Sequence, residues 1–308
     1  MRRPMSFIHD HETALPPALQ EQVLLRLGFA QRPEPTLAGL RTLYAAWGRS
    51  IPFDNVRKLI QVRSGGTGPL PGYTPVNFFT AWLRYGTGGT CWSNAGAMHA
   101  LLASLGFHTV RGVATMLAAP DLPPNHGTTR VSFGPEHYLV DGSMLHGEPL
   151  RLDEQTETAT EHPAWGVRCG RRDGHWFIAW RPLHKVDGFA CRLERFGASQ
   201  AEYQDSYEQT RGWSPFNYEV SARRNLGEEV VGVGFGHAVT LHADGSVSRT
   251  PIERAERDRV LIESVGLSEE IVAQLPADEP TPPPPGSKTA EAAAHILPPL
   301  QGSGRRPI

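Results

Sequence analysis

The chain has little cysteine and no long apolar run. Only three of its 308 residues are cysteines, at positions 91, 169 and 191. Three scattered thiols without a C-x-x-C spacing fit neither a disulfide framework nor a cysteine metal site, so we expect a reducing compartment. No stretch approaches the roughly 18 apolar residues of a membrane span, and the first residues lack the apolar core of a signal peptide. We therefore expect a cytoplasmic protein without a membrane partner.

The charged residues disfavour two further kinds of partner. The formal net charge is −2, and no basic run interleaves with aromatic residues, so the pattern that attracts nucleic acid is missing. Thirteen histidines are present, but no two of them are four residues apart, as a pair of metal ligands on one helix face would be. We expect no nucleic-acid partner and no metal, and the sequence leaves the oligomeric state open.

The periodicity of apolar residues divides the chain into a helical beginning and a strand-rich middle. Helical spacing extends from Pro16 to about Gly28, from Thr36 to Trp47 and from Val76 to Tyr85. After Phe107 the period changes to two, with the turn Gly134-Pro135 between short strands. Such a series of short strands and turns is typical of a barrel or a sandwich.

A mixed segment and a tail follow. Val230 to Leu241 is expected to pair as one strand with Ser246 to Thr250 across Asp244-Gly245, a strong hairpin signal. Helices are expected from Ile252 to Val265 and from Ser268 to Leu275. From Pro276 the composition is dominated by Pro, Ala, Gly and Ser, so we expect residues 276–308 to be disordered.

Cys91 is the first candidate for a catalytic residue. It follows Gly88-Gly89-Thr90, and the apolar positions from Ala95 to Leu105 predict a helix that begins close to it. A single cysteine is most often a small buried apolar side chain. At a helix N-terminus, however, the unpaired N–H groups and the helix dipole favour the thiolate, which is the nucleophilic form.

Downstream, His126 and Asp141 could supply a base and the carboxylate that orients it. His126 opens the first strand of the hairpin and Asp141 ends the second, so antiparallel pairing through Gly134-Pro135 would bring these ends together. One ring nitrogen could then bind the carboxylate while the other accepts the thiol proton. His137 is the alternative base, because it shares a strand face with Asp141, but it lies beside the turn. Either histidine could instead be structural.

These residues, with several shorter motifs, resemble the arylamine N-acetyltransferase family. The resemblance runs from about Leu25 to Leu275. Its motifs, in order along the chain, are Arg26-Leu27-Gly28, Pro35-Thr36-Leu37-Ala38-Gly39-Leu40, Ile51-Pro52-Phe53-Asp54-Asn55, Gly88-Gly89-Thr90-Cys91 with Asn94, His126, Tyr138-Leu139-Val140-Asp141 and Ser214-Pro215-Phe216.

The resemblance implies an α+β fold with a Cys-His-Asp core like that of cysteine proteases. We expect a helical domain over residues 1–106 that carries the nucleophile, and a β-barrel domain over 107–212 that carries the histidine and the aspartate. An α/β lid domain would follow over 213–275, and then the disordered tail over 276–308.

The resemblance also implies an acyltransferase that works by a ping-pong mechanism. Cys91 would take an acetyl group from acetyl-CoA as a thioester and pass it to an arylamine, a hydrazine or an arylhydroxylamine. His126 would act as base and acid, oriented by Asp141. The partners would be a small-molecule amine acceptor and acyl-CoA. The implied substrate and CoA contacts are Phe53, Gly142, Ser143, Met144 and Ser214.

The sequence departs from the family pattern in two places. Thr87 and Ser93 stand where the family usually has Arg and Glu, so two opposite charges are absent together. The segment from Gly142 to Gly147 replaces a shorter Val-Gly-Phe-Gly stretch beside the pocket. Three alternatives remain open: an amide synthase that releases a carrier-bound acyl chain, a transglutaminase-like or protease-like thiol hydrolase, and a non-catalytic binding module.

Overall fold

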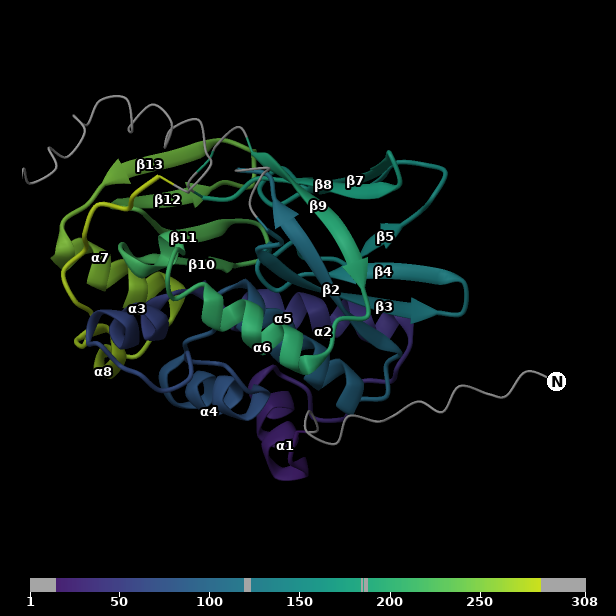
Figure 1. Ribbon diagram of the computed structural model, residues 1–308, viewed down its shortest axis with the longest axis horizontal. Coiled ribbons are helices and arrows are strands. Elements are labelled where there is room, and N and C mark those ends of the chain that lie inside the picture. The colour runs from purple at the N-terminus through teal and green to yellow at the C-terminus, as the bar shows by residue number, and fades with distance from the viewer. Residues whose placement is uncertain (1–14, 119–122, 184, 186–187, 284–308) are drawn as a thin grey trace, which may run out of the picture.

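The helices at the start of the chain form a layer against which two antiparallel sheets pack (Figure 1). The computed structural model describes residues 15–118, 123–183, 185 and 188–283. The first five helices are α1 (Pro17–Arg26), α2 (Leu37–Ser50), α3 (Val56–Arg63), α4 (Pro75–Tyr85) and α5 (Cys91–Ser104). Helices α1, α2 and α4 confirm the three helices predicted from periodicity.

Local signals in the sequence fix where these helices begin and end. The Thr36 hydroxyl accepts a hydrogen bond from the Gly39 N–H (3.1 Å) at the start of α2, and Thr74 caps α4 in the same way. Helix α4 ends at Tyr85 and is capped by Gly86, whose φ of 76° lies in the left-handed region. The faces turned inward bury large side chains, among them Trp47, Trp82, Phe78 and Phe79. Burial of each such side chain contributes about 1.5–3 kcal/mol to folding.

The larger sheet has eight strands and closes almost into a barrel. Its order is β5-β4-β3-β2-β9-β8-β7-β6, and the edge strands β5 and β6 contact each other. The strands are β2 (Thr109–Met116), β3 (His126–Phe133), β4 (Glu136–Val140), β5 (Leu150–Leu152), β6 (Thr158–Thr160), β7 (Val167–Arg172), β8 (His175–Trp180) and β9 (Phe189–Phe196). Apolar side chains such as Ile178, Cys191 and Leu139 fill the interior. The predicted barrel is confirmed, and the sandwich is excluded.

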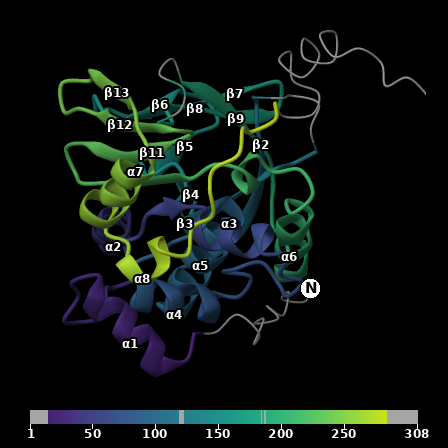
Figure 2. The ribbon, with the colours of Figure 1, turned by 90° about the vertical axis from the view of Figure 1, so that its left-hand side faces the viewer.

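The smaller sheet has five strands in the order β1-β10-β11-β12-β13. They are β1 (Phe53–Asp54), β10 (Ser221–Asn225), β11 (Val230–Gly234), β12 (His237–Leu241) and β13 (Val247–Pro251). Helix α3, α7 (Arg254–Val260), a turn of π-helix (Leu261–Val265) and α8 (Glu269–Val272) share its apolar core. Figure 2 shows α7 and α8 on the near side of this sheet. In the described ranges, no helix is long and apolar enough to cross a membrane.

Two elements differ from the expectation. Val230 to Leu241 is not one strand, because β11 and β12 form a hairpin whose tip is Phe235-Gly236. Both tip residues have positive φ, 47° and 75°, as a tight two-residue turn requires, and phenylalanine seldom adopts that conformation. Helix α3 was not predicted, since only eight residues separate Asn55 from the loop that starts at Ser64.

Residues 276–283 lie against the body of the protein, although they were expected to be disordered. Asp278 pairs with the buried Arg257 (2.8 Å) and accepts a hydrogen bond from the Val220 N–H (3.0 Å). Further along, the Thr281 hydroxyl donates to Glu219 (2.7 Å). Composition alone could not reveal these polar contacts. The rest of the predicted tail, 284–308, lies outside the described residues, and the domain boundaries stay predictions.

Helix α6 (Gln200–Gln209) connects the barrel to the helical layer through Tyr203. The Tyr203 hydroxyl is buried between β2 and β3, where it accepts from the Thr128 N–H (3.1 Å) and donates to the Thr128 carbonyl oxygen (2.6 Å) or to that of Gly112. The ring packs edge-on against Trp92 in α5, with centroids 5.0 Å apart. One hydroxyl therefore satisfies backbone groups on both strands behind the predicted catalytic histidine.

Tyr203→Phe should lower the free energy of unfolding by about 1–3 kcal/mol, because a buried N–H loses its acceptor while the ring packing is kept. Urea unfolding monitored by circular dichroism measures the change. Tyr85→Phe is the matched control, since the Tyr85 ring lies near the surface over Arg84 (4.7 Å to the ring centroid) and should change stability by less than about 0.5 kcal/mol. Equal stability losses in both variants would contradict the role assigned to the Tyr203 hydroxyl.

Candidate active site

Cys91 is the first residue of α5. Thr90 precedes it in an extended conformation as the N-cap, so the thiol lies at the positive end of the helix dipole. The side chain is partly buried, and its Sγ lies 3.7 Å from the Asn125 carbonyl oxygen, just before β3. The other two cysteines of the chain, Cys169 and Cys191, are buried in the barrel. Cys91 is thus the accessible thiol.

The loop before Cys91 is fastened to the edge of the five-stranded sheet. The buried Asp54 carboxylate accepts hydrogen bonds from the N–H groups of Gly88 (2.6 Å) and Val56 (3.0 Å), and the Asp54 N–H donates to the Gly89 carbonyl oxygen (3.2 Å). A Cβ at Gly88 would lie 1.9 Å from the Pro52 carbonyl oxygen. The glycine is therefore required by the close approach of two backbones.

The histidine and the aspartate predicted from the hairpin meet at its open end. His126 Nε2 lies 2.7 Å from Asp141 Oδ2, and both side chains are buried. Because Nε2 is engaged by Asp141, Nδ1 is the ring nitrogen left for Cys91, which is close enough to act on the pKa of His126. Burial alone would lower the pKa of His126, but the charge and hydrogen bond of Asp141, together with the nearby Cys91, raise it well above its ordinary value. Burial would likewise raise the pKa of Asp141, and the charge and hydrogen bond of His126 hold it below its usual range.

Asp141 is itself held by the chain around it. Its Oδ1 accepts hydrogen bonds from the N–H groups of Ser143 (2.9 Å) and Met144 (3.2 Å). Its backbone N–H donates to the Tyr44 hydroxyl (3.0 Å), and that hydroxyl donates to the Asp141 carbonyl oxygen (2.8 Å). The segment after β4 therefore orients the carboxylate through backbone groups, whatever side chains it carries.

The alternative base, His137, lies away from this group. Its Nδ1 is 2.9 Å from the Ser132 hydroxyl, on the opposite strand of the same hairpin and near the turn. Burial, followed by the charges of Arg130 and His108, lowers the pKa of His137. The geometry thus favours His126 over His137 as the partner of Cys91.

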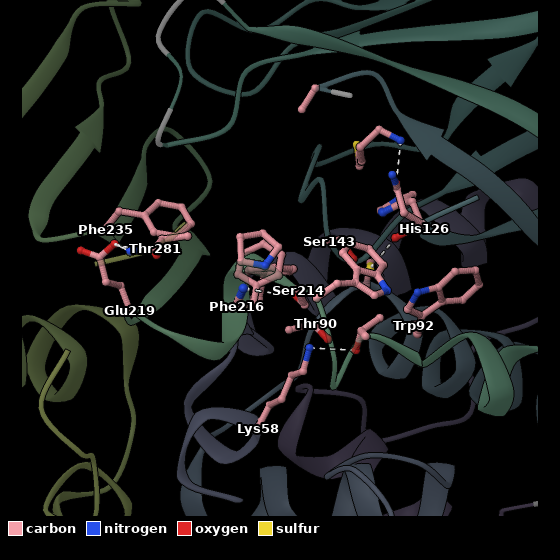
Figure 3. Close-up of a pocket in the computed structure, with 18 of the residues that line it drawn as sticks. Lys58, Thr90, Trp92, His126, Ser143, Ser214, Phe216, Glu219, Phe235 and Thr281 are labelled. Atoms are coloured by element: carbon pink, nitrogen blue, oxygen red, sulfur yellow. Dashed lines mark hydrogen bonds between the residues drawn. The ribbon is translucent and has the colours of Figure 1, made fainter. Parts of the chain in front are cut away.

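A cavity of about 510 Å³ opens beside Cys91 and His126. Of the other predicted contacts, Phe53, Ser143 and Ser214 line it, together with the aromatic residues Trp180, Trp213, Phe216 and Phe235. Figure 3 shows Trp92 and His126 on one side of the cavity and Glu219, Phe235 and Thr281 on the other. Gly142 and Met144 lie behind the wall: Gly142 packs against Asn94, and Met144 is buried in the barrel core.

Two buried cations in the cavity wall were missed by the sequence analysis. Lys58 of α3 donates from Nζ to the Thr210 hydroxyl (2.8 Å), and the Arg223 guanidinium donates to the Ser143 carbonyl oxygen. Arg223 also lies over the ring of Phe53, 4.3 Å from its centroid. Burial lowers the pKa of Lys58 to about 7 and that of Arg223 to about 9, and the nearby Cys91 acts in the opposite sense on both. No motif marked these residues: Lys58 lies on α3, which was not predicted, and Arg223 lies on the polar strand β10.

The positions where the sequence departs from the family pattern are neutral and buried. Thr87 and Ser93 are at most 3% exposed, and the Ser93 hydroxyl donates to the Thr90 carbonyl oxygen (3.1 Å). Because both members of the usual charge pair are replaced, no lone charge is buried there. No group of three or more His, Cys, Asp or Glu residues that could hold a metal ion is found in the described part of the chain.

The comparisons with solved structures define the fold. An arylamine N-acetyltransferase from Nocardia farcinica superposes with a TM-score of 0.69 at 22% identity, over 83% of this chain and 92% of that one. The Mycobacterium marinum arylamine N-acetyltransferase in complex with CoA gives a TM-score of 0.68 at 21% identity, over 84% of this chain and 95% of that one. The chain thus has the arylamine N-acetyltransferase fold.

The sequence comparisons define the family. A family model described as N-acetyltransferase matches residues 36–271. Arylamine N-acetyltransferases from Mycolicibacterium smegmatis and Mycobacterium tuberculosis are 29% and 31% identical to 52% of this chain, over 62% and 59% of their own lengths. The match thus spans about three fifths of the curated relatives. The chain belongs to this family, that of the arylamine N-acetyltransferases.

The His126–Asp141 pair should make stability depend on pH. Because the pKa of Asp141 is lowered, its contribution exists above the unfolded value of about 3.9 and is lost as the pH falls through the folded value. Because the pKa of His126 is raised, its contribution is complete below about 6.5 and is lost as the pH rises toward the folded value.

Asp141→Asn should therefore cost on the order of 3 kcal/mol at pH 6, where the wild-type pair is fully charged, and less at pH 9. Urea unfolding at several pH values gives the difference between the two proteins. Lys58, with its lowered pKa, stabilises the fold as the pH rises, but it does so in both proteins and cancels in the difference. A difference that stays constant from pH 6 to 9 would show that His126 is neutral in the folded protein.

Alkylation of Cys91 can identify its base. In the wild type, iodoacetamide should label Cys91 rapidly well below about pH 8, as an ion-paired thiolate requires. His126→Ala should shift the pH profile of labelling upward, whereas the control His137→Ala should leave it unchanged. The rates are measured by mass spectrometry of the Cys91 peptide. A shift in His137→Ala without one in His126→Ala would assign the base to His137.

Proposed function

We propose that this chain transfers an acetyl group from acetyl-CoA to an aromatic amine, a hydrazine or an arylhydroxylamine through a thioester on Cys91. The observation that carries the proposal is the position of Cys91 beside the buried His126–Asp141 pair, with the thiol at a helix N-terminus and on the wall of a 510 Å³ cavity. Membership of the family supports the same reaction.

In the first half-reaction, the Cys91 thiolate attacks the carbonyl carbon of the acetyl thioester. The tetrahedral intermediate carries its negative charge near the start of α5, where unpaired N–H groups and the helix dipole favour an anion. The carbon–sulfur bond to CoA then breaks as His126, protonated at Nδ1, gives its proton to the leaving CoA sulfur. Acetylated Cys91 and neutral His126 remain.

In the second half-reaction, the nitrogen of the acceptor attacks the acetyl carbon on Cys91. Neutral His126 accepts a proton from that nitrogen at Nδ1 as the new C–N bond forms. The C–S bond then breaks, the amide leaves, and the Cys91 thiolate and the His126 imidazolium are restored. Asp141 stabilises the imidazolium and fixes which ring nitrogen faces the thiol throughout.

The lining of the cavity suits the proposed substrates. Trp213, Phe216 and Phe235 offer ring faces and edges on which a flat aromatic acceptor can pack. The related Mycobacterium marinum enzyme is known in complex with CoA, which supports CoA as the carrier of the acyl group here. The predicted contacts Phe53, Ser143 and Ser214 line this cavity, and we retain them as substrate contacts.

The experiment that tests the proposal is incubation with acetyl-CoA in the absence of an acceptor. Intact-protein mass spectrometry should show one acetyl group on Cys91, and an added arylamine should remove it as the acetylated amine forms. Cys91→Ala and Cys91→Ser should show neither adduct nor turnover and should keep their folds, since a partly buried small side chain contributes little packing. Hydrolysis to acetate at an unchanged rate with and without amine would indicate the thiol hydrolase instead.

A further inference from the structure

Lys58 and Arg223 are two positive charges that the proposed reaction does not use. Both line the cavity with Cys91, and they are only 3% and 5% exposed. Within the described ranges neither forms an ion pair with a carboxylate, and the Arg223 Nε has no hydrogen-bond partner although it is buried. Buried charges are normally paired, so a cavity that keeps two such cations calls for an anion.

The carboxylates near these cations are already engaged. Glu208 is the carboxylate whose charge acts on Lys58. It forms an ion pair with Arg211 (2.9 Å) and accepts a hydrogen bond from the Leu70 N–H (2.6 Å). Asp141, which acts on Arg223, is bound to His126. Both carboxylates therefore bind other groups and form no ion pair with Lys58 or Arg223.

The balance of charge leaves room for one more anion. With the thiolate and the imidazolium formed, Cys91, His126 and Asp141 carry one net negative charge, whereas protonated Lys58 and Arg223 together carry two positive charges. Glu219 and Lys185 also line the cavity, but their opposite charges offset each other, and Glu219 accepts a hydrogen bond from the Thr281 hydroxyl (2.7 Å). Arg223 itself lies between the rings of Phe53 (4.3 Å to the centroid) and Trp180 (4.7 Å). Figure 3 shows the Lys58 side chain extending toward Thr90, the residue before the nucleophile, with its ammonium bound to Thr210.

We infer that the cavity binds a substrate that carries a carboxylate, held by Arg223 and Lys58 while its reacting group lies at Cys91. A carboxylate can accept from the free Arg223 Nε and from the remaining Lys58 donors, as charge-assisted hydrogen bonds do. The inference rests on the proposed acyl transfer. The carboxylate belongs either to the acceptor, as in an aminobenzoate, or to the acyl group, as in a succinyl thioester.

The first arm of the test compares two acceptors with acetyl-CoA as donor: 4-aminobenzoate and its uncharged methyl ester. We expect the wild type to favour the acid in kcat/KM by about tenfold or more, mainly through KM, because a buried charge-assisted bond is worth at least about 1.5 kcal/mol. The second arm compares succinyl-CoA with butyryl-CoA in acylation of Cys91, followed by mass spectrometry. A preference in the first arm places the carboxylate on the acceptor, and one in the second arm places it on the acyl group.

Lys58→Met and Arg223→Gln should each reduce the preference toward unity. Because the ratio is compared between variants, the different nucleophilicity of the two amines cancels. Arg224→Gln is the matched control: it is the next residue on β10, and its side chain bonds to the carbonyl oxygens of Arg49 and Val265 outside the cavity. It should keep the wild-type ratio. If Arg223→Gln does not fold, the ratio in Lys58→Met compared with that in the wild type still tests the inference.

Two results would overturn the inference, and they are distinguishable. If Cys91 is acylated by CoA thioesters but neither arm shows a preference for the charged substrate, the carboxylate site is wrong and the proposed function stands. If no CoA thioester acylates Cys91, the proposed acyl transfer and the carboxylate site are both wrong. A preference that persists undiminished in Lys58→Met and Arg223→Gln would also contradict the assignment of these two residues.

Discussion

The interaction on which the site depends is the buried pair of Asp141 and His126. Its 2.7 Å contact joins the two strands of one hairpin, and the backbone of Asp141 is bound in turn to the Tyr44 hydroxyl on α2. The pair therefore fixes the barrel to the helical layer at the same point where it orients the imidazole. Removing the carboxylate would leave a buried imidazole that can no longer remain charged, so the fold and the proposed chemistry share one electrostatic requirement.

The nucleophile reaches this pair from a different part of the fold. Cys91 belongs to the helical layer, but the Asp54 carboxylate of β1 holds the preceding loop through the Gly88 N–H. Strand β1 is the edge of the five-stranded sheet, beside β10, which carries Arg223. Both sheets and the helical layer thus meet at the cavity. A change in how the five-stranded sheet packs would move the thiol and a cation of the cavity wall together.

The sequence predicted those parts of the site that have a local signature. Glycines before a helical pattern marked Cys91, and a hairpin with a histidine and an aspartate at its open end predicted the His126–Asp141 contact. Lys58 and Arg223 carry no such signature, because α3 is short and β10 is a polar-looking strand whose burial comes from distant contacts. The contacts of residues 276–283 were missed for a related reason: a proline-rich composition indicates disorder, yet Asp278 pairs with the buried Arg257, which composition cannot reveal.

The two unused cations have a cost that bears on their role. Each buried, unpaired charge destabilises a fold by several kcal/mol before compensation. Contacts with the faces of Phe53 and Trp180 return roughly 0.5–2 kcal/mol each, and the Ser143 carbonyl group and the Thr210 hydroxyl add single hydrogen bonds. Together these contacts stabilise the fold less than a well-packed apolar residue at the same position would. Residues that destabilise a fold in this way concentrate at sites where the protein binds or reacts. Here Lys58 and Arg223 both line the cavity that contains the nucleophile Cys91. The energetic argument therefore agrees with the charge balance: the two cations are fully stabilised only when a substrate anion binds to them in the cavity.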